Sequence, residues 1–371
     1  MIEVGYLGSW SSKMSNFSAG LVNSGGGSNV GKQNLAPTPA SFYASGNEPN
    51  VASNSILSQQ VANPYNINNF AAIQSSNPAA YNQMSHSGTF TNATVPISNL
   101  VRPYSFMGGL TQVSPIGQSN FHELLVTVTK RMSHGFNLNA GFQKNYQYDR
   151  DYFNNAYDTS MSWEPTNSSY PWRLTLEGIY EMPFGPGKTW ANSGWKSAIF
   201  GGFRLNGTWE FSPGPLIEFG NMFYVGDIKA SNILMPHPVY NTNVAAGVYN
   251  VQWLNPGSAT ATVNSDGSCT YSGTGFVTNP SCQPNGYNVR SFPTRVDGVR
   301  QMGVNIVMAN VERSFKIREG INFQMRVDAN NLFNHQTLAG PNTTVTGSQF
   351  GQITGTLENG RWIDIQGHIR F

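Results

Sequence analysis

The protein has 371 residues, enough for one large β-structure or two ordinary soluble domains. Lys and Arg total 21 and Asp and Glu total 19, so the net charge of +2 excludes the basic surface of a nucleic-acid-binding protein. Only 11% of residues are charged but 12% are aromatic, which excludes intrinsic disorder and suits either a β-barrel with a wet lumen or a secreted β-sandwich.

Period-two alternation of apolar and polar side chains predicts eight β-strands. In chain order they span residues 2–10, 122–131, 136–148, 172–182, 199–211, 300–313, 321–333 and 361–371. In the strand 300–313 the apolar positions are Met302, Val304, Ile306 and Met308. The clearest of the eight exceed the usual five or six residues of a soluble strand and match the roughly 9–11 tilted residues that cross a bilayer. A half-exposed soluble sheet is the alternative, but apolar faces rich in Phe, Ile and Trp favour the membrane.

The connections alternate between short and long. Ser133–Gly135 and Lys316–Gly320 are tight, and Pro183–Gly187 opens a short Gly/Pro-rich link. The long segments lie near 11–119, 149–170, 213–298 and 335–360, with extra strands expected at 104–112 and 216–225. Outer-membrane barrels have short periplasmic turns and long external loops. The sequence therefore predicts an all-β fold, an antiparallel transmembrane β-barrel portion of about eight to ten strands with long extracellular loops.

The first predicted strand begins at residue 2, and MIEVGYLGSW has neither a basic n-region nor an apolar h-region. No apolar run is long enough for a transmembrane helix. An open sheet edge in lipid leaves backbone groups unpaired, at several kcal/mol each. Either the eight strands close on themselves or strands precede them, and the great length of the loops favours preceding strands.

Cys269 and Cys282 flank a polar stretch rich in Gly, Ser and Asn. In an oxidising compartment they would form a disulfide that stabilises the loop by roughly 3 kcal/mol. The alternative is two unrelated free thiols. Because no further metal-ligand spacing accompanies them, a zinc site is not expected.

Motifs along nearly the whole chain resemble the C-terminal barrel part of Oar-like TonB-dependent receptors. The matching stretches are GYLGSW (5–10), VANPY (61–65), RPYSFMGGL (102–110), FHELLVTVTKRMSHGFNLNAGF (121–142), GIYEMPFGPGK (178–188), GGFRLNGTWEFSPGPL (201–216), FKIREGINFQMRVDANNLFNH (315–335), FGQITGT (350–356) and RWIDIQGHIRF (361–371). The NLFNH segment with the alternating C-terminal ending is the most specific, whereas Pro213 departs from the Ser-Gly pair more common in the family.

The resemblance implies a larger barrel, a signal peptide, a carboxypeptidase-regulatory-like β-sandwich and an N-terminal plug domain that this chain lacks. It also implies partners: outer-membrane lipid, the barrel-assembly machinery, the TonB system and an unknown large solute. The expected location is the outer membrane of a Gram-negative cell. We interpret the chain as a fragment of such a transporter that is not competent for energised uptake alone. The alternative is a small plugless barrel that displays loops for adhesion or surface binding.

Two groups of residues are candidates for function. Ile363, Ile365, Ile369 and Phe371 would form the C-terminal barrel-assembly signal, read by strand addition, unless they only close the barrel. Arg204, Glu210, Arg326 and Asp328 lie on predicted lumen faces, either contacting plug or substrate or forming a salt-bridge network that fixes barrel shape.

The tryptophans of the connections and strand ends have two interpretations, sugar binding or residence at membrane interfaces, and the second is favoured. They are Trp163, Trp172, Trp190, Trp195 and Trp253. The six histidines are scattered, without metal-binding spacing, and no nucleophile elbow is present. We therefore expect no enzymatic activity, no cofactor, no metal and no nucleic-acid partner.

Overall fold

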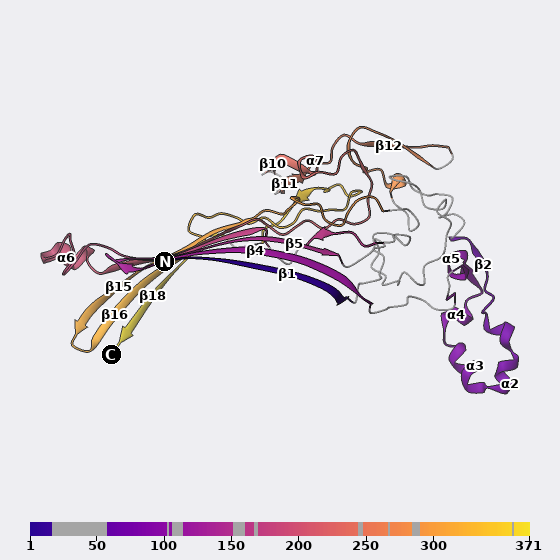
Figure 1. Cartoon of the computed structure of the whole chain (residues 1–371), viewed down its shortest axis with the longest axis horizontal. Coiled ribbons are helices and arrows are strands. Elements are labelled where there is room, and N and C mark those ends of the chain that lie inside the picture. Colours follow the sequence, from indigo (N-terminus) through magenta and orange to yellow (C-terminus); the bar gives the residue numbers. More distant parts are fainter. Residues whose placement is uncertain are drawn as a thin grey trace.

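The computed structural model describes residues 1–16, 58–101, 104–105, 114–150, 160–166, 170–243, 248–265, 268–283, 290–357 and 360–371. A long, curved antiparallel sheet runs through most of the molecule (Figure 1). The short links and the end of the chain lie at one end of this sheet, and the long connections extend from the other. We call these the short-link end and the long-loop end.

All eight predicted strands are present, and each pairs antiparallel with the next. In chain order and in sheet order they are β1 (Ile2–Asn16), β4 (Ser114–Ser133), β5 (Phe136–Arg150), β7 (Trp172–Glu181), β8 (Phe203–Ser212), β15 (Val304–Arg318), β16 (Ile321–Asn330) and β18 (Trp362–Arg370). The short β6 (Glu164–Pro165) pairs with β5 and makes the sheet nine-stranded.

The register gives the sheet one apolar and one polar face. Side chains alternate along a strand, so directly opposed residues share a face. Leu174 lies opposite Phe142 and Phe211, on what we call the apolar face. Glu177 lies opposite Asn139, on what we call the polar face. The register confirms the alternation predicted for 136–148, and it confirms that predicted for 321–333 and 361–371 over 321–330 and 362–370. The prediction of 321–333 is wrong at its end, because β16 stops at Asn330, Asn331 has a left-handed backbone with φ of 49°, and Phe333 lies outside the strand.

The two tight turns form where the backbone can adopt positive φ. His134 and Gly135 connect β4 to β5 with φ of 52° and 76°, the signature of a two-residue type I′ hairpin. Gly320, with φ of 81°, lies in the turn between β15 and β16. These turns bring consecutive strands side by side and so establish the meander.

The predicted strand 199–211 is wrong at its start. Residues 194–200 form a helix, α6 (Gly194–Phe200), and β8 begins only at Phe203. Gly202 separates the two elements with φ of 79°, a conformation that a side chain disfavours. Ile199 therefore belongs to the link between β7 and β8 and lies outside the sheet.

The apolar positions expected in 300–313 were also assigned to the wrong face. Ile306 lies opposite Glu210 and Met308 opposite Thr208, so both belong to the polar face. The first half of β15 is apolar on both faces, with Val307 on the other side. Alternation alone could not decide which side chains of this strand lie on the apolar face, because the pairing with β8 decides it.

The long connections contain short elements of their own. Between β1 and β4 these are β2 (Gln60–Ala62), η3 (Ile67–Phe70), α2 (Ala72–Ser76), α3 (Pro78–Met84), α4 (Gly88–Thr91), β3 (Thr94–Pro96) and α5 (Ile97–Leu100). After β8 come β9 (Tyr224–Val225), α7 (Ala230–Ile233), β10 (Leu234–Asn243), β11 (Val248–Leu254), β12 (Thr260–Val263), β13 (Cys269–Ser272), β14 (Gly275–Phe276) and η5 (Pro280–Cys282), and after β16 comes β17 (Gln352–Ile353).

The extra strand expected at 216–225 is not a hairpin strand of the main sheet. In 216–225, Leu216 forms only an isolated bridge with Arg300, and β9 pairs with β14. Most of 104–112 lies outside the described residues. The expected long segments near 11–119 and 149–170 are also shortened, because β1 extends to Asn16, β4 begins at Ser114 and β5 ends at Arg150.

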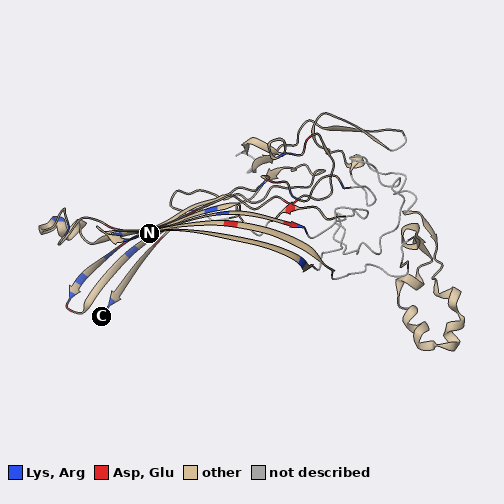
Figure 2. Ribbon diagram, viewed as in Figure 1, with Lys and Arg blue, Asp and Glu red and all other residues tan. Residues whose placement is uncertain are grey.

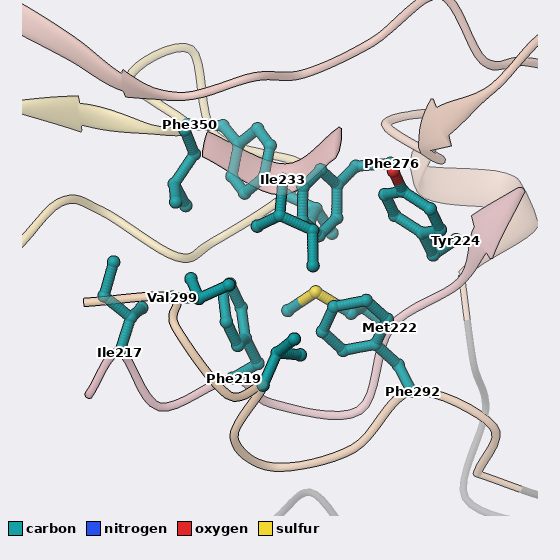
Figure 3. Packing of buried hydrophobic residues seen from close by; sticks show 12 residues of the cluster. Ile217, Phe219, Met222, Tyr224, Ile233, Phe276, Phe292, Val299 and Phe350 are labelled. Carbon is teal, nitrogen blue, oxygen red and sulfur yellow. The ribbon is translucent and has the colours of Figure 1, made fainter. Parts of the chain in front are cut away.

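The main hydrophobic core lies in the long connections (Figure 3). Phe276 is fully buried there, and its ring lies 5.0 Å from that of Tyr224 and 4.9 Å from that of Phe350. Since Phe350 follows β16 and the other two precede β15, this cluster joins two connections. The apolar face of the sheet, in contrast, leaves large side chains such as Leu124 and Phe142 exposed. Such a face needs an apolar environment.

The sheet is not closed among the described residues. β1 pairs only with β4, and β18 only with β16, so each has one unpaired edge. The apolar-face side chains Ile2 and Val4 of β1 and Ile365 of β18 are about 70% exposed. Both edges expose backbone donors and acceptors beside apolar side chains. A sheet that spans a bilayer does not leave such backbone groups unpaired.

Candidate functional site

The polar face carries a chain of ion pairs at the short-link end. Arg204 of β8 donates to Glu312 of β15 at 3.1 Å and to Glu181 of β7 at 3.3 Å. Lys188 of the following link reaches Glu181 at 2.9 Å. Arg204 therefore joins three adjacent strands through their side chains. The sequence identified Arg204 but not its partners, which only the cross-strand register shows.

The other three candidates of the polar face also form ion pairs. Arg326 contacts Asp328 through both Nε and Nη2, at 2.8 and 2.6 Å from Oδ1. Arg173 contacts Glu210 at 2.9 Å. The structure thus places all four predicted residues on one face, in separate ion pairs that do not form a single cluster. Such partly exposed pairs are worth at most about 1 kcal/mol each and define shape more than stability.

A concavity of about 520 Å³ lies on the polar face between these ion pairs. Its lining contains Glu177, Arg326 and Asp328, and the asparagines Asn137, Asn139, Asn206, Asn310 and Asn330. It lies over the backbone of Gly178, Gly207 and Ala309, whose own Cβ positions belong to the apolar face, and polar-face side chains from β5, β7, β8, β15 and β16 surround it. The amide and carboxylate groups would hydrogen-bond a polar partner in many orientations. No single ligand chemistry is specified.

The C-terminal strand presents an apolar row along its open edge. Ile363, Ile365 and Ile369 are between 61% and 72% exposed, and Phe371 is 99% exposed. Their neighbours Asp364, Gln366 and His368 lie on the polar face, opposite Asp328, Arg326 and Gln324. This strand offers unpaired backbone groups and an apolar row that is interrupted at Gly367. These are the two features by which an incoming strand adds to a sheet.

The disulfide between Cys269 and Cys282 joins β13 to η5 in the long connection. Both cysteines are buried in a small cluster with Phe223 and Val277. This cluster adjoins the main loop core through consecutive residues, since Tyr224 belongs to that core. Burial, together with nearby Asp227, raises the pKa of Tyr224. The connection is therefore a packed structure closed by a covalent bond.

The part of the chain that the structure describes contains no candidate metal site. No group of three or more His, Cys, Asp or Glu side chains there lies close enough to hold a metal ion. His122 instead contacts Tyr6 through Nδ1 at 2.6 Å, on the apolar face. Within the described residues, no helix has the length and apolar character needed to cross a membrane.

These features define a class of protein: a membrane β-sheet protein with an apolar outer face, a polar inner face and long connections gathered at one end. A family described as "Outer membrane beta barrel domain" matches residues 1–364, and the chain belongs to this family. The protein is therefore located in the cell outer membrane, in contact with its lipid. Members of this family are typically transporters or receptors and not enzymes.

No curated protein matches the chain in sequence. Among solved structures, the chain is weakly similar to the ferric-catecholate import receptor Fiu of Escherichia coli K12 in its closed form. The match has 12% sequence identity and a TM-score of 0.17, and it covers 76% of this chain. It covers 48% of the Fiu chain, so this chain spans about half the length of that receptor.

Proposed function

We propose that the chain is the C-terminal portion of a TonB-dependent outer-membrane transporter or receptor that takes up a large solute. The observation that carries the proposal is the pair of open edges, β1 and β18, on a sheet of outer-membrane type. In lipid each unpaired backbone group costs several kcal/mol. Further strands between these two edges would remove that cost and produce a wider barrel.

The motifs of the sequence support the particular kind of transporter. The NLFNH segment and the RWIDIQGHIRF ending resemble Oar-like receptors; the first directly follows β16, and the second contains the whole of β18. In this proposal the short-link end faces the periplasm and the long-loop end faces outward. The polar face lines the lumen, where Arg204, Glu210, Arg326 and Asp328 maintain barrel shape through their ion pairs.

The proposed partners follow from the same assignment. The barrel-assembly machinery would bind the apolar row Ile363, Ile365, Ile369 and Phe371 on the open edge of β18. In the full-length protein, a plug domain would fill the lumen and the TonB system would drive transport. This chain alone would not perform energised uptake. Uptake restored by the chain in a transporter-deleted strain would contradict this.

The second candidate is a small barrel in which β1 pairs directly with β18 and the packed loops serve adhesion. Eight meandering strands place β1 antiparallel to β18, so this closure is sterically consistent. The test is a bismaleimide cross-link between Leu7→Cys in β1 and Gln366→Cys in β18, both on the polar face. A cross-link in the outer membrane would favour the small barrel. Its absence, with a control pair across β16 and β18 cross-linked, would favour additional strands.

A further inference from the structure

The link between β7 and β8 exposes an unusual amount of apolar surface. It contains α6, which lies at the extreme short-link end of the molecule, beyond the sheet (Figure 1). Trp190 and Trp195 are 58% and 65% exposed, and Ile199 and Phe200 are about half exposed. Trp195 and Ile199 are four residues apart and so share one side of the helix. Exposure of this apolar surface to water would be unfavourable, so we expect lipid or an apolar partner surface to cover it.

The link has a defined shape. The ring of Phe184 packs 5.7 Å from that of Trp190, and the Gly202 amide donates to the Phe184 carbonyl at 3.4 Å. Gly185 and Gly201 approach so closely that a Cβ on either would overlap the backbone of the other. The backbone that carries the exposed side chains therefore has a defined conformation.

Arg313 attaches the end of α6 to the apolar face of the sheet. This residue lies on β15 directly opposite Phe203 and Met325, on the apolar face. Its guanidinium donates to the Ile199 carbonyl at 2.6 Å and to the Ala198 carbonyl. The rings of Phe203 and Phe315 lie 4.9 and 4.2 Å from it. The apolar side chains of α6 thus continue the face of the sheet that contacts lipid.

Cationic side chains accompany this apolar surface. Lys196 lies on α6 itself, and Arg318, opposite Ile321 on the apolar face, ends β15. Figure 2 shows basic residues in blue on α6 and at the tip of β15, both at the short-link end. Lys130, on the apolar face at the same end, lies 5.0 Å from the ring of Phe136. Amphipathic segments with Trp and Phe on one side and Lys on the other bind at the headgroup boundary of a bilayer, and basic residues are attracted to anionic lipid phosphates.

We infer that the β7–β8 link is a membrane anchor that inserts Trp195, Ile199 and Phe200 into the phospholipid leaflet at the short-link end. Lys196 would remain at the phosphate level. The link would hold the barrel at a fixed depth and resist its displacement along the membrane normal. This inference rests on the proposed function, in which the short-link end faces the periplasmic leaflet.

The test measures the depth of a fluorescent probe in proteoliposomes of phosphatidylethanolamine and phosphatidylglycerol. The full chain carries a nitrobenzoxadiazole label at Ile199→Cys, with Cys269 and Cys282 left as a disulfide. The matched control is Asn192→Cys, an exposed polar position in the same link. Leu176→Cys, on the apolar face in the middle of β7, is the reference for membrane insertion of the sheet. Quenchers are nitroxide-labelled lipid and aqueous iodide.

We expect the probe at 199 to be blue-shifted and quenched strongly by lipid nitroxide, like that at 176, and the probe at 192 to be quenched by iodide. Quenching at 176 by lipid but at 199 by iodide alone would overturn the anchor while leaving the membrane barrel intact. In that case the exposed surface of the link would be accessible to a soluble protein instead of lipid. Iodide quenching at all three positions would contradict the spanning sheet itself. Heat-modifiable gel migration checks that each labelled variant is folded.

Discussion

Arg204 of β8 lies directly opposite Glu312 of β15, and its guanidinium donates to the Glu312 carboxylate at 3.1 Å. The same guanidinium reaches Glu181 on the other neighbouring strand. One arginine therefore connects three strands on the polar face. This arrangement pairs each of these charged side chains with one of opposite sign and so lowers their electrostatic energy.

Replacing Arg204 with Ala should lower the free energy of unfolding by roughly 1 kcal/mol, because Glu312 loses its ion-pair partner and Glu181 keeps only Lys188, in a partly exposed site. The measurement is the urea midpoint of the refolded protein in detergent. Arg204→Ala combined with Glu312→Ala should cost less than the sum of the single changes, since the two residues interact directly. As a control, Lys229→Ala should change nothing measurable, because the Asp227–Lys229 pair is highly exposed. If the effects of Arg204→Ala and Glu312→Ala are additive, these two residues are not coupled.

Two turn glycines offer a comparison between backbone strain and steric overlap. Gly135 and Gly320 both have φ near 80°, but a Cβ at Gly135 would lie 2.9 Å from the Glu181 carbonyl oxygen, whereas one at Gly320 meets nothing within 4 Å. Gly320→Ala should cost about 1–2 kcal/mol from the left-handed backbone alone. Gly135→Ala should cost more, and also loosen the contact with β7. Equal unfolding midpoints for the two variants would contradict the close approach.

Features of the fold that depend on the local sequence pattern could be predicted from the sequence. Features that depend on pairing between distant strands could not. All eight strands followed from period-two alternation, because most of them have one apolar and one polar face along their length. The face of β15 did not follow, because Ile306 and Val307 are both apolar and only β8 chooses between them. Helix α6 was missed because Ile199 continued an alternating pattern into β8 across Gly201 and Gly202.

The candidate site divides in the same way. Charged residues on the polar face were visible as the polar half of an alternating strand. The partners of Arg204 were not, because Glu181 lies 23 positions from it and Glu312 lies 108 positions from it. The loop core was not predicted either. Residues such as Phe219, Phe276 and Phe350 show no regular period, and they meet only after distant connections fold against each other.

The disulfide should stabilise the long connection without affecting the sheet. Removing it as Cys269→Ser with Cys282→Ser should cost about 3 kcal/mol in local stability, the value expected for closing a loop of this length. Limited proteolysis with mass spectrometry should then find new cleavage between β12 and η5. Heat-modifiable migration of the barrel should be unchanged, because neither cysteine lies in a strand of the main sheet. Reduction of the disulfide in the unmodified protein should produce the same new cleavage. An unaltered proteolysis pattern in the double variant would contradict the prediction.

Phe371 provides the last prediction. Its ring is almost fully exposed at the end of an apolar row, and the strand before it has an open edge. If the barrel-assembly machinery binds this edge by strand addition, deletion of Phe371 should reduce the amount of protein in the outer membrane several-fold and leave unassembled chain in the periplasm. Arg370→Ala, on the polar face of the same strand, should assemble normally. Fractionation with heat-modifiable gel migration measures both. Normal assembly without Phe371 would show that the row only closes the barrel, and a defect shared by both variants would indicate that the strand pairs poorly irrespective of recognition.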